Sequence, residues 1–186
     1  MLELPKEKFS IVLLDPPWSY YGQQDKWTAA AKFYKTMSDE ELLTFPVKNI
    51  LEERAILFLW ATSPRLDFAI DCIRSWGLYY RGMAFVWIKT KLDGTPIKAQ
   101  GIRPSIIKPL TEFILAASSV KTGRPLHLED ESVVQTIFAA KTEHSEKPKE
   151  VYERIESMYP KETRIELFAR NKRNGWCGWG DQYPTE

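Results

Sequence analysis

The sequence predicts an α/β fold in which a mostly parallel sheet is covered by helices on both faces. Short apolar runs rich in Ile, Val and Phe alternate along the chain with stretches of helical periodicity. Most of these runs lack strict alternation of apolar and polar residues, which is typical of strands buried on both faces. The predicted strands are Phe9–Leu14, Ala55–Trp60, Met83–Ile88, Phe113–Ala117, Val133–Ala139 and Arg164–Ala169.

Three helices are predicted between these strands. Ser38, followed by acidic residues up to Glu41, matches a capping box and begins a short helix. Ser63 and the proline after it begin a second helix, which ends at Gly77. Pro148 begins the third, whose apolar side chains recur at helical spacing. Helices that alternate with strands favour the α/β class over an all-β or all-α fold.

Length and composition exclude several classes of protein. A chain of 186 residues buries about 70 % of its unfolded surface, and we expect one domain over residues 1–186. The formal net charge of +1 excludes a strongly basic coat. The two cysteines are too few for a disulfide scaffold, and the two histidines lack metal-ligand spacing, so we expect no metal. No apolar run spans a membrane and no hydrophobic signal core stands at the start, so we expect a cytoplasmic protein.

Two long segments interrupt the alternation of strands and helices. Residues 19–36 and 89–110 are polar and punctuated by Gly or Pro, which is typical of functional loops. From Lys89 to Arg124 there are seven Lys and Arg against two acidic residues. This stretch therefore predicts a positive patch on a nearly neutral protein. The alternative is that these charges are merely solvated.

The most informative residues are Asp15, Pro16, Pro17 and Trp18, directly after the first predicted strand. Ligands of open α/β sheets bind beyond the carboxyl ends of the strands. The prolines fix φ and remove two backbone donors, so we expect the carbonyls of Asp15 and Pro16 to be free. A carboxylate and a rigid carbonyl can accept both protons of an exocyclic amine, and stacking of a base on Trp18 contributes about 1–3 kcal/mol. The alternative is an ordinary strand-ending turn with a buried Trp.

This tetrapeptide resembles the signature of amino-group methyltransferases that act on nucleic acids, and most closely the DPPW-type adenine N-6 methyltransferases of the MT-A70 family. Further segments resemble the family's pattern in its order, from residue 9 to residue 182. They are Trp87–Lys89, Thr111–Phe113, Glu143–Pro148 with Val151, Tyr152 and Ile155, Glu166–Arg170, and Trp179–Gln182. The resemblance implies a Rossmann-like methyltransferase fold and S-adenosylmethionine as the cofactor. It also implies that the two long segments are substrate loops.

The resemblance also implies site residues, with Asp15–Trp18 as the catalytic motif. Lys147 would meet the cofactor's carboxylate, Glu166 and Arg170 its ribose, and Phe168 its adenine. The full implied cofactor set is Asp15, Lys147, Glu166, Phe168, Arg170, Arg173 or Asn174, Asp181 and Gln182. The expected nucleic-acid contacts are Tyr20, Tyr21, Lys89, Lys91, Lys98, Arg103 and Lys108.

The expected activity is methyl transfer from S-adenosylmethionine to the 6-amino group of adenine in nucleic acid. DNA is favoured over RNA, because so small a chain resembles the bacterial and phage members of the family. Two alternatives stay open: a non-catalytic nucleic-acid-binding subunit, and a methyltransferase for a small molecule or a protein side chain. The recognition sequence, the strandedness of the substrate and the choice between monomer, homodimer and partner subunit also stay open.

Overall fold

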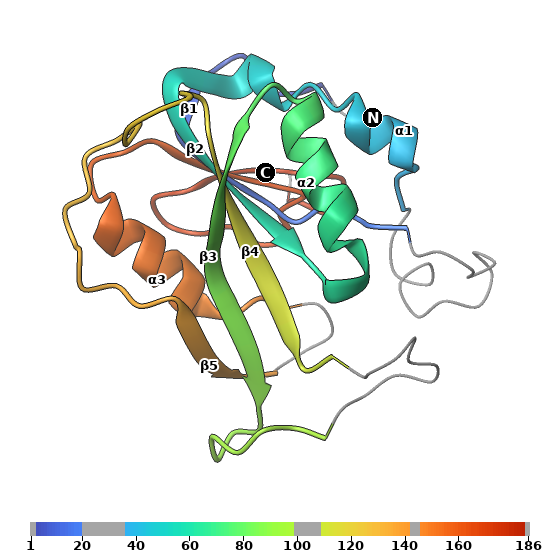
Figure 1. The fold of residues 1–186 in the computed structure, drawn as a ribbon, viewed down its shortest axis with the longest axis vertical. Helices are drawn as coiled ribbons and strands as arrows, with labels where there is room; N and C mark the ends of the chain where they lie inside the picture. Colours follow the sequence, from blue (N-terminus) through green and yellow to red (C-terminus); the bar gives the residue numbers. More distant parts are fainter. Residues whose placement is uncertain (1–2, 20–35, 99–108, 142–145, 185–186) are drawn as a thin grey trace.

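The computed structural model describes residues 3–19, 36–98, 109–141 and 146–184 (Figure 1). The strands in these ranges form one seven-stranded sheet in the order β5-β3-β4-β2-β1-β6-β7. They are β1 (Phe9–Leu14), β2 (Leu51–Ala61), β3 (Tyr79–Thr90), β4 (Thr111–Ser118), β5 (Thr136–Ala140), β6 (Arg164–Leu167) and β7 (Cys177–Trp179). Because β1 lies between β2 and β6 and is parallel to both, its carboxyl end lies beside theirs, away from the outermost strands β5 and β7.

The sheet is mostly parallel, as predicted. Strand β4 runs antiparallel to its two neighbours β2 and β3, whereas the other neighbouring pairs are parallel. The amino end of β4 therefore lies at the same edge as the carboxyl ends of the parallel strands. This reversal later brings an acidic side chain into the site.

Helices cover both faces of the sheet (Figure 1). Side chains of β1 alternate between the two faces: Val12 and Leu14 pack in the cluster with α1 and α2, and Ile11 and Leu13 in the cluster with α3. The helices are α1 (Asp39–Leu43), α2 (Leu66–Ser75) and α3 (Lys149–Met158), with short 3-10 turns at Val47–Ile50 and Ser63–Arg65. Each strand at the centre of the sheet is thus buried on both faces, which explains why apolar and polar residues do not alternate along it.

The predicted helix starts are confirmed. Ser38 caps α1: its Oγ accepts a hydrogen bond from the Glu41 amide, and the Glu41 carboxylate accepts one from the Ser38 amide. The second helix begins as the 3-10 turn at Ser63 before it continues as α2, and Gly77 follows it with a φ of 72°. Pro148 is the N-cap of α3.

The strand boundaries differ from the prediction in two informative places. Strand β6 ends at Leu167, because Phe168 has a φ of 60° and leaves the extended conformation. Strand β7 was not predicted: its three residues, Cys177–Trp179, make no apolar run and become a strand only by pairing with β6.

Of the two long segments, residues 20–35 and 99–108 lie outside the described residues. The second segment does not begin at Lys89 as predicted, because β3 continues to Thr90. A turn then follows in which the Lys91 amide donates to the Thr95 carbonyl at 2.8 Å. Within the described ranges, every helix is too short and too polar to cross a membrane.

Candidate active site

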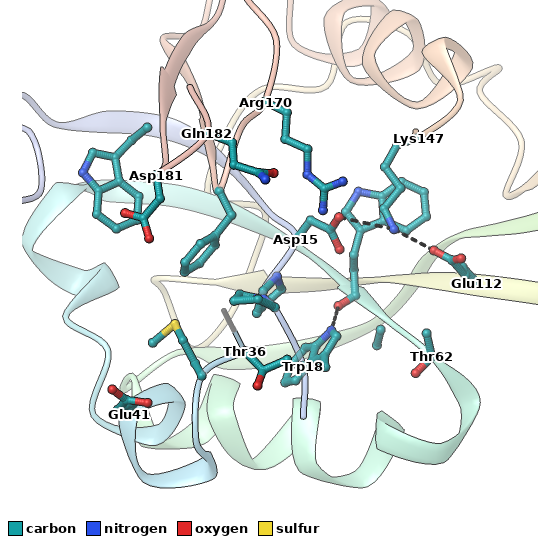
Figure 2. Close-up of a pocket in the computed structure, with 17 residues that line it drawn as sticks. Asp15, Trp18, Thr36, Glu41, Thr62, Glu112, Lys147, Arg170, Asp181 and Gln182 are labelled. Carbon is teal, nitrogen blue, oxygen red and sulfur yellow. Dashed lines mark hydrogen bonds and ion pairs between the residues drawn. The ribbon is translucent and has the colours of Figure 1, made fainter. Parts of the chain in front are cut away.

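A cavity of about 410 Å³ opens where β1, β2 and β6 end and β4 begins (Figure 2). Its volume is in the range of about 300–1,000 Å³ that small-molecule sites occupy. Most of its lining comes from the turns that follow the strands, where backbone direction and side-chain aim are set by the sheet. The lining residues are Asp15, Pro16, Pro17, Trp18, Thr36, Met37, Glu41, Trp60, Ala61, Thr62, Glu112, Lys147, Phe168, Arg170, Trp179, Asp181 and Gln182.

Four charged side chains form an ion-pair chain, and three of them, Asp15, Glu112 and Lys147, line this cavity. Lys147 Nζ lies 3.3 Å from Asp15 Oδ2 and 2.7 Å from Glu112 Oε2, and Lys89 Nζ pairs with the other oxygen of Glu112. Figure 2 shows Lys147 between the two carboxylates, with Arg170 extending toward Asp15 from above in this view. The Lys147 ammonium also lies 4.6 Å from the centre of the Trp60 ring, which favours its charge.

Burial and charge act against each other in the ion-pair chain. Burial raises the pKa of the Asp15 carboxyl, and the nearby Lys147 only partly offsets this. Burial also penalises ionised Glu112, but Lys147 and Lys89 outweigh it and lower the pKa of Glu112 to about 2. For Lys147, the two carboxylates outweigh burial and raise its pKa. Lys147 and Glu112 are therefore ionised at neutral pH, and Asp15 is the member whose charge costs the folded state most.

A stability measurement tests the charge of Glu112. Because its pKa is lower in the folded state than in the unfolded state, ionised Glu112 stabilises the protein above pH 4.5, and this contribution is lost as the pH falls toward 2. Glu112→Gln should therefore cost about 1.5–3 kcal/mol at pH 7 and progressively less in acid, measured by urea unfolding. Glu131→Gln, in an exposed pair with Arg124, is the matched control. A constant difference between wild type and Glu112→Gln over this pH range would contradict the expected titration.

The DPPW segment, Asp15–Trp18, makes more hydrogen bonds through its backbone carbonyls than its two prolines suggested. The prediction that the Pro16 carbonyl is free is wrong, because it accepts a hydrogen bond of 2.8 Å from the Trp18 amide. The Pro17 carbonyl accepts one of 3.1 Å from the Met37 amide. The Trp18 side chain is 5 % exposed, and its Nε1 donates to the Trp60 carbonyl at 3.2 Å. Trp18 thus forms a buried part of the cavity wall. Its hydrogen bond to Trp60 of β2 and that of Pro17 to Met37 fix its position.

The turn after β6 is strained and held in place by β7. Phe168 is the one non-glycine residue with positive φ in the described ranges, and its ring packs on Phe45 and Trp179, each with ring centres 5.5 Å away. The Ala169 amide donates to the Trp179 carbonyl at 2.9 Å. A Cβ at Gly180 would lie 2.9 Å from Phe168 Cα, so only glycine allows this approach. The turn then presents Arg170, Asp181 and Gln182 to the cavity.

Replacing Gly180 tests this close approach. In Gly180→Ala the added methyl meets backbone atoms of Phe168 and Ala169, which cannot rotate away, so the two segments must separate. We expect a loss of about 1–3 kcal/mol in the free energy of unfolding, as for overpacking elsewhere. Cofactor affinity, measured by calorimetry, should fall as well, because Asp181 and Gln182 follow directly. Unchanged stability and affinity would show that the turn tolerates a wider separation.

The structure brings most of the predicted cofactor residues to the cavity, but not three of them. Glu166 faces α3 instead, because Ile165 and Leu167 on either side of it point to the opposite face, and it accepts a hydrogen bond of 2.8 Å from Tyr152. The Arg173 guanidinium lies 3.6 Å from the centre of the Tyr152 ring. Asn174 is exposed outside the cavity lining.

The structure describes three of the seven predicted nucleic-acid contacts, and one of these three differs from the other two. Lys89 is not a surface cation: it pairs with Glu112, and its ammonium lies 5.0 Å from the centre of the Trp87 ring. Lys91 and Lys98 are exposed after β3. The remaining candidates, Tyr20, Tyr21, Arg103 and Lys108, lie outside the described residues.

Sequence reasoning missed Glu112 as a site residue. Its segment was matched to the family as a strand, and strand starts are normally remote from the ligand edge of a parallel sheet. The acid joins the site because β4 is reversed, a feature that local patterns do not reveal. The other cavity-lining residues that were missed are Thr36, Met37, Glu41, Trp60, Ala61, Thr62 and Trp179.

A mostly parallel sheet with helices on both faces and a cavity beyond the carboxyl ends of its strands is the architecture of a Rossmann-like α/β fold. The family model MT-A70 matches residues 9–182, and the chain belongs to this family of methyltransferases.

Three relatives illustrate the range of the family. Type II methyltransferase M.MunI of Mycoplasma sp. is 34% identical over 98% of this chain and 81% of its own length. The N(6)-adenosine-methyltransferase catalytic subunit METTL3 of Homo sapiens is 31% identical over 94% of this chain, and the MT-A70-like protein of Drosophila melanogaster is 30% identical over 94%. The chain spans only 28% and 27% of these two longer proteins.

Proposed function

We propose that the protein transfers a methyl group from S-adenosylmethionine to the 6-amino group of adenine in nucleic acid, with DNA as the favoured substrate. The observation that carries this proposal is the Asp15 carboxylate, which follows the central strand β1 and lines a cavity of about 410 Å³. The names of the relatives support it, since one is a type II methyltransferase and another an N(6)-adenosine-methyltransferase.

The residues of the cavity fit the cofactor. S-adenosylmethionine has a carboxylate, an ammonium, a sulfonium, a ribose diol and an adenine. Arg170 and Lys147 are cations for the carboxylate, and Asp15 is an acceptor for the ammonium. Asp181 and Gln182 can hydrogen-bond the ribose hydroxyls, and the ring of Phe168 offers an apolar face to the adenine. When bound, the cofactor supplies an electrophilic methyl group at its sulfonium.

The chain's own groups act by positioning. The Asp15 carboxylate accepts a hydrogen bond from the target amine and thereby orients the nitrogen lone pair, which the adenine ring otherwise delocalises. Lys147 and Glu112 hold that carboxylate in one place through the ion-pair chain. Transfer then needs no covalent enzyme intermediate, and preorganisation contributes most of the catalysis. In a duplex the adenine must first leave the stack, at a cost of a few kcal/mol.

A direct experiment is incubation with isotopically labelled cofactor and parallel pools of DNA and RNA, followed by mass spectrometry of the nucleosides. We expect the label on the 6-amino group of adenine from DNA, and Asp15→Asn as the inactive control. Label on RNA alone would reverse the substrate preference. Label on neither, together with bound nucleic acid, would favour the non-catalytic subunit instead. Because the human relative is a catalytic subunit, the mass of the active species should be measured in parallel.

The basic segment after β3 is the proposed nucleic-acid surface, of which Lys91 and Lys98 are the described and exposed members. Replacing both by Ala should weaken DNA binding and lower the slope of log affinity against log salt by about 0.9 for each phosphate that is no longer neutralised. Cofactor affinity should not change. Lys121→Ala is the matched control, because β4 carries this lysine of the predicted basic stretch to the opposite edge of the sheet. An unchanged salt slope in the double variant would place the phosphate contacts elsewhere.

A further inference from the structure

We propose that Arg65 is a positioning residue that holds Trp18, and the chain that follows the DPPW motif, against the wall of the cavity. The inference rests on the proposed methyl transfer for its kinetic consequences, but not for its structural ones. Arg65 was not predicted as a site residue, and it does not line the cavity. It acts through the side chains that surround it.

The first observation is the burial of a full charge. The side chain of Arg65 is 1 % exposed, and Arg65 is the only charged residue of the described ranges that is fully buried. It lies in the 3-10 turn that follows the carboxyl end of β2, directly after the cavity residues Ala61 and Thr62. Burial of a charge is costly unless it is paired and hydrogen-bonded, so the contacts that Arg65 makes must offset this cost.

The second observation is the set of contacts behind Trp18. The Arg65 guanidinium lies 4.1 Å from the centre of the Phe68 ring and 6.0 Å from that of Trp18. Phe68 in turn meets Trp18 edge-on, with ring centres 6.1 Å apart. The Trp18 indole lies directly above α2 in Figure 2, with its Nε1 bonded to the Trp60 carbonyl. Arg65 and Phe68 therefore support this indole from the side of α2.

The third observation is that Arg65 reaches, through Asp39, both the residue after the motif and the start of α1. Its Nη2 forms an ion pair with Asp39 Oδ1, and the same oxygen accepts a hydrogen bond of 3.2 Å from Ser19 Oγ. Asp39 is the first residue of α1, and the nearby Met37 amide is bonded to the Pro17 carbonyl at 3.1 Å. One guanidinium thus joins Trp18, Ser19 and the start of α1.

The chemistry of the guanidinium explains why arginine stands here. Its planar, permanently charged group can lie over aromatic rings with one face while its edge donates to a carboxylate. The ammonium of a lysine is a compact point charge and cannot do both. Arg65→Lys should therefore fail to restore what Arg65→Met loses, although it keeps the charge.

The test uses three variants, Arg65→Met, Arg65→Lys and Asp39→Asn, with Arg74→Met as the matched control. Arg74 lies on α2 in an exposed pair with Asp71. Asp39→Asn keeps the size of a side chain that is 36 % exposed, so it should fold even if a buried substitution does not. The structural readout is the 19F NMR signal of Trp18 in 5-fluorotryptophan-labelled protein, assigned by its loss in Trp18→Phe. The functional readouts are cofactor affinity by calorimetry, kcat, and KM for DNA.

We expect the Trp18 signal to shift or broaden in all three variants and to stay in place in Arg74→Met. The KM for DNA should rise about tenfold, which corresponds to about 1.4 kcal/mol, because a displaced Trp18 changes the wall of the cavity, while cofactor affinity stays unchanged. A lower melting temperature with an unmoved Trp18 signal and unchanged KM would overturn the inference, because Arg65 would then only stabilise the fold. Rescue by Arg65→Lys would also contradict it. If wild-type protein transfers no methyl group, the proposed function fails, yet the Trp18 signal still decides the role of Arg65.

Discussion

We expect Asp15→Asn to lower the turnover of methyl transfer by about 10²–10³-fold, the usual effect of removing one preorganised polar group from the reacting centre. Asparagine has the same shape, but its amide oxygen is an uncharged and weaker acceptor for the target amine, and its NH2 group is a donor. Lys147 pairs with Asp15 at 3.3 Å and also with Glu112. In the variant, the Lys147 ammonium therefore keeps one carboxylate partner, Glu112. Initial rates with saturating cofactor and DNA provide the measurement.

The same variant should be at least as stable as the wild type at neutral pH. Burial raises the pKa of Asp15, so the folded protein holds the proton more tightly than the unfolded chain does. Loss of that proton as the pH rises therefore destabilises the fold, and the neutral amide avoids this cost. The melting temperature is the control that separates lost chemistry from lost structure. A folded variant that kept more than about a tenth of the wild-type turnover would remove Asp15 from the proposed chemistry.

Lys147→Met should have the largest effect on the site as a whole. It leaves the carboxylates of Asp15 and Glu112 buried near each other without the cation between them. Breaking a buried pair in this way typically costs about 3–5 kcal/mol of stability. Because Lys147 lowers the pKa of Asp15, its removal should raise that pKa further and move the acid limb of the pH–rate profile to higher pH. Cofactor binding should weaken by about 1.5–3 kcal/mol if Lys147 also meets the cofactor's carboxylate.

Two further variants separate these effects. Lys149→Met removes an exposed lysine of α3 that pairs with Glu153, and it should change neither stability nor the pH profile. The double variant Lys147→Met with Glu112→Gln removes one of the facing charges, so it should recover part of the stability but none of the cofactor affinity. If Lys147→Met binds the cofactor as the wild type does, Lys147 is a partner of the protein's own carboxylates alone.

The sequence alone was enough for the fold class and for the strand end, after Leu14, at which the cavity opens. Strand periodicity, the cap at Ser38 and the proline before α3 depend on residues a few positions apart, so they can be read locally. Asp15 was placed at a strand end by the same local reasoning. The fold class and the family followed because these signals and the motif blocks run in order through the whole chain.

Only the tertiary structure decided which side chains meet. Glu112 and Lys147 are 35 positions apart, and they pair because β4 is reversed and the start of α3 reaches the same edge. Glu166 turned away from the cavity because its place in the alternation of β6 aims it at α3. Arg65 and Asp39 are separated by 26 positions and meet only after α1 and α2 pack together. Such contacts depend on strand order and direction, which arise from packing across the whole chain rather than from any local pattern.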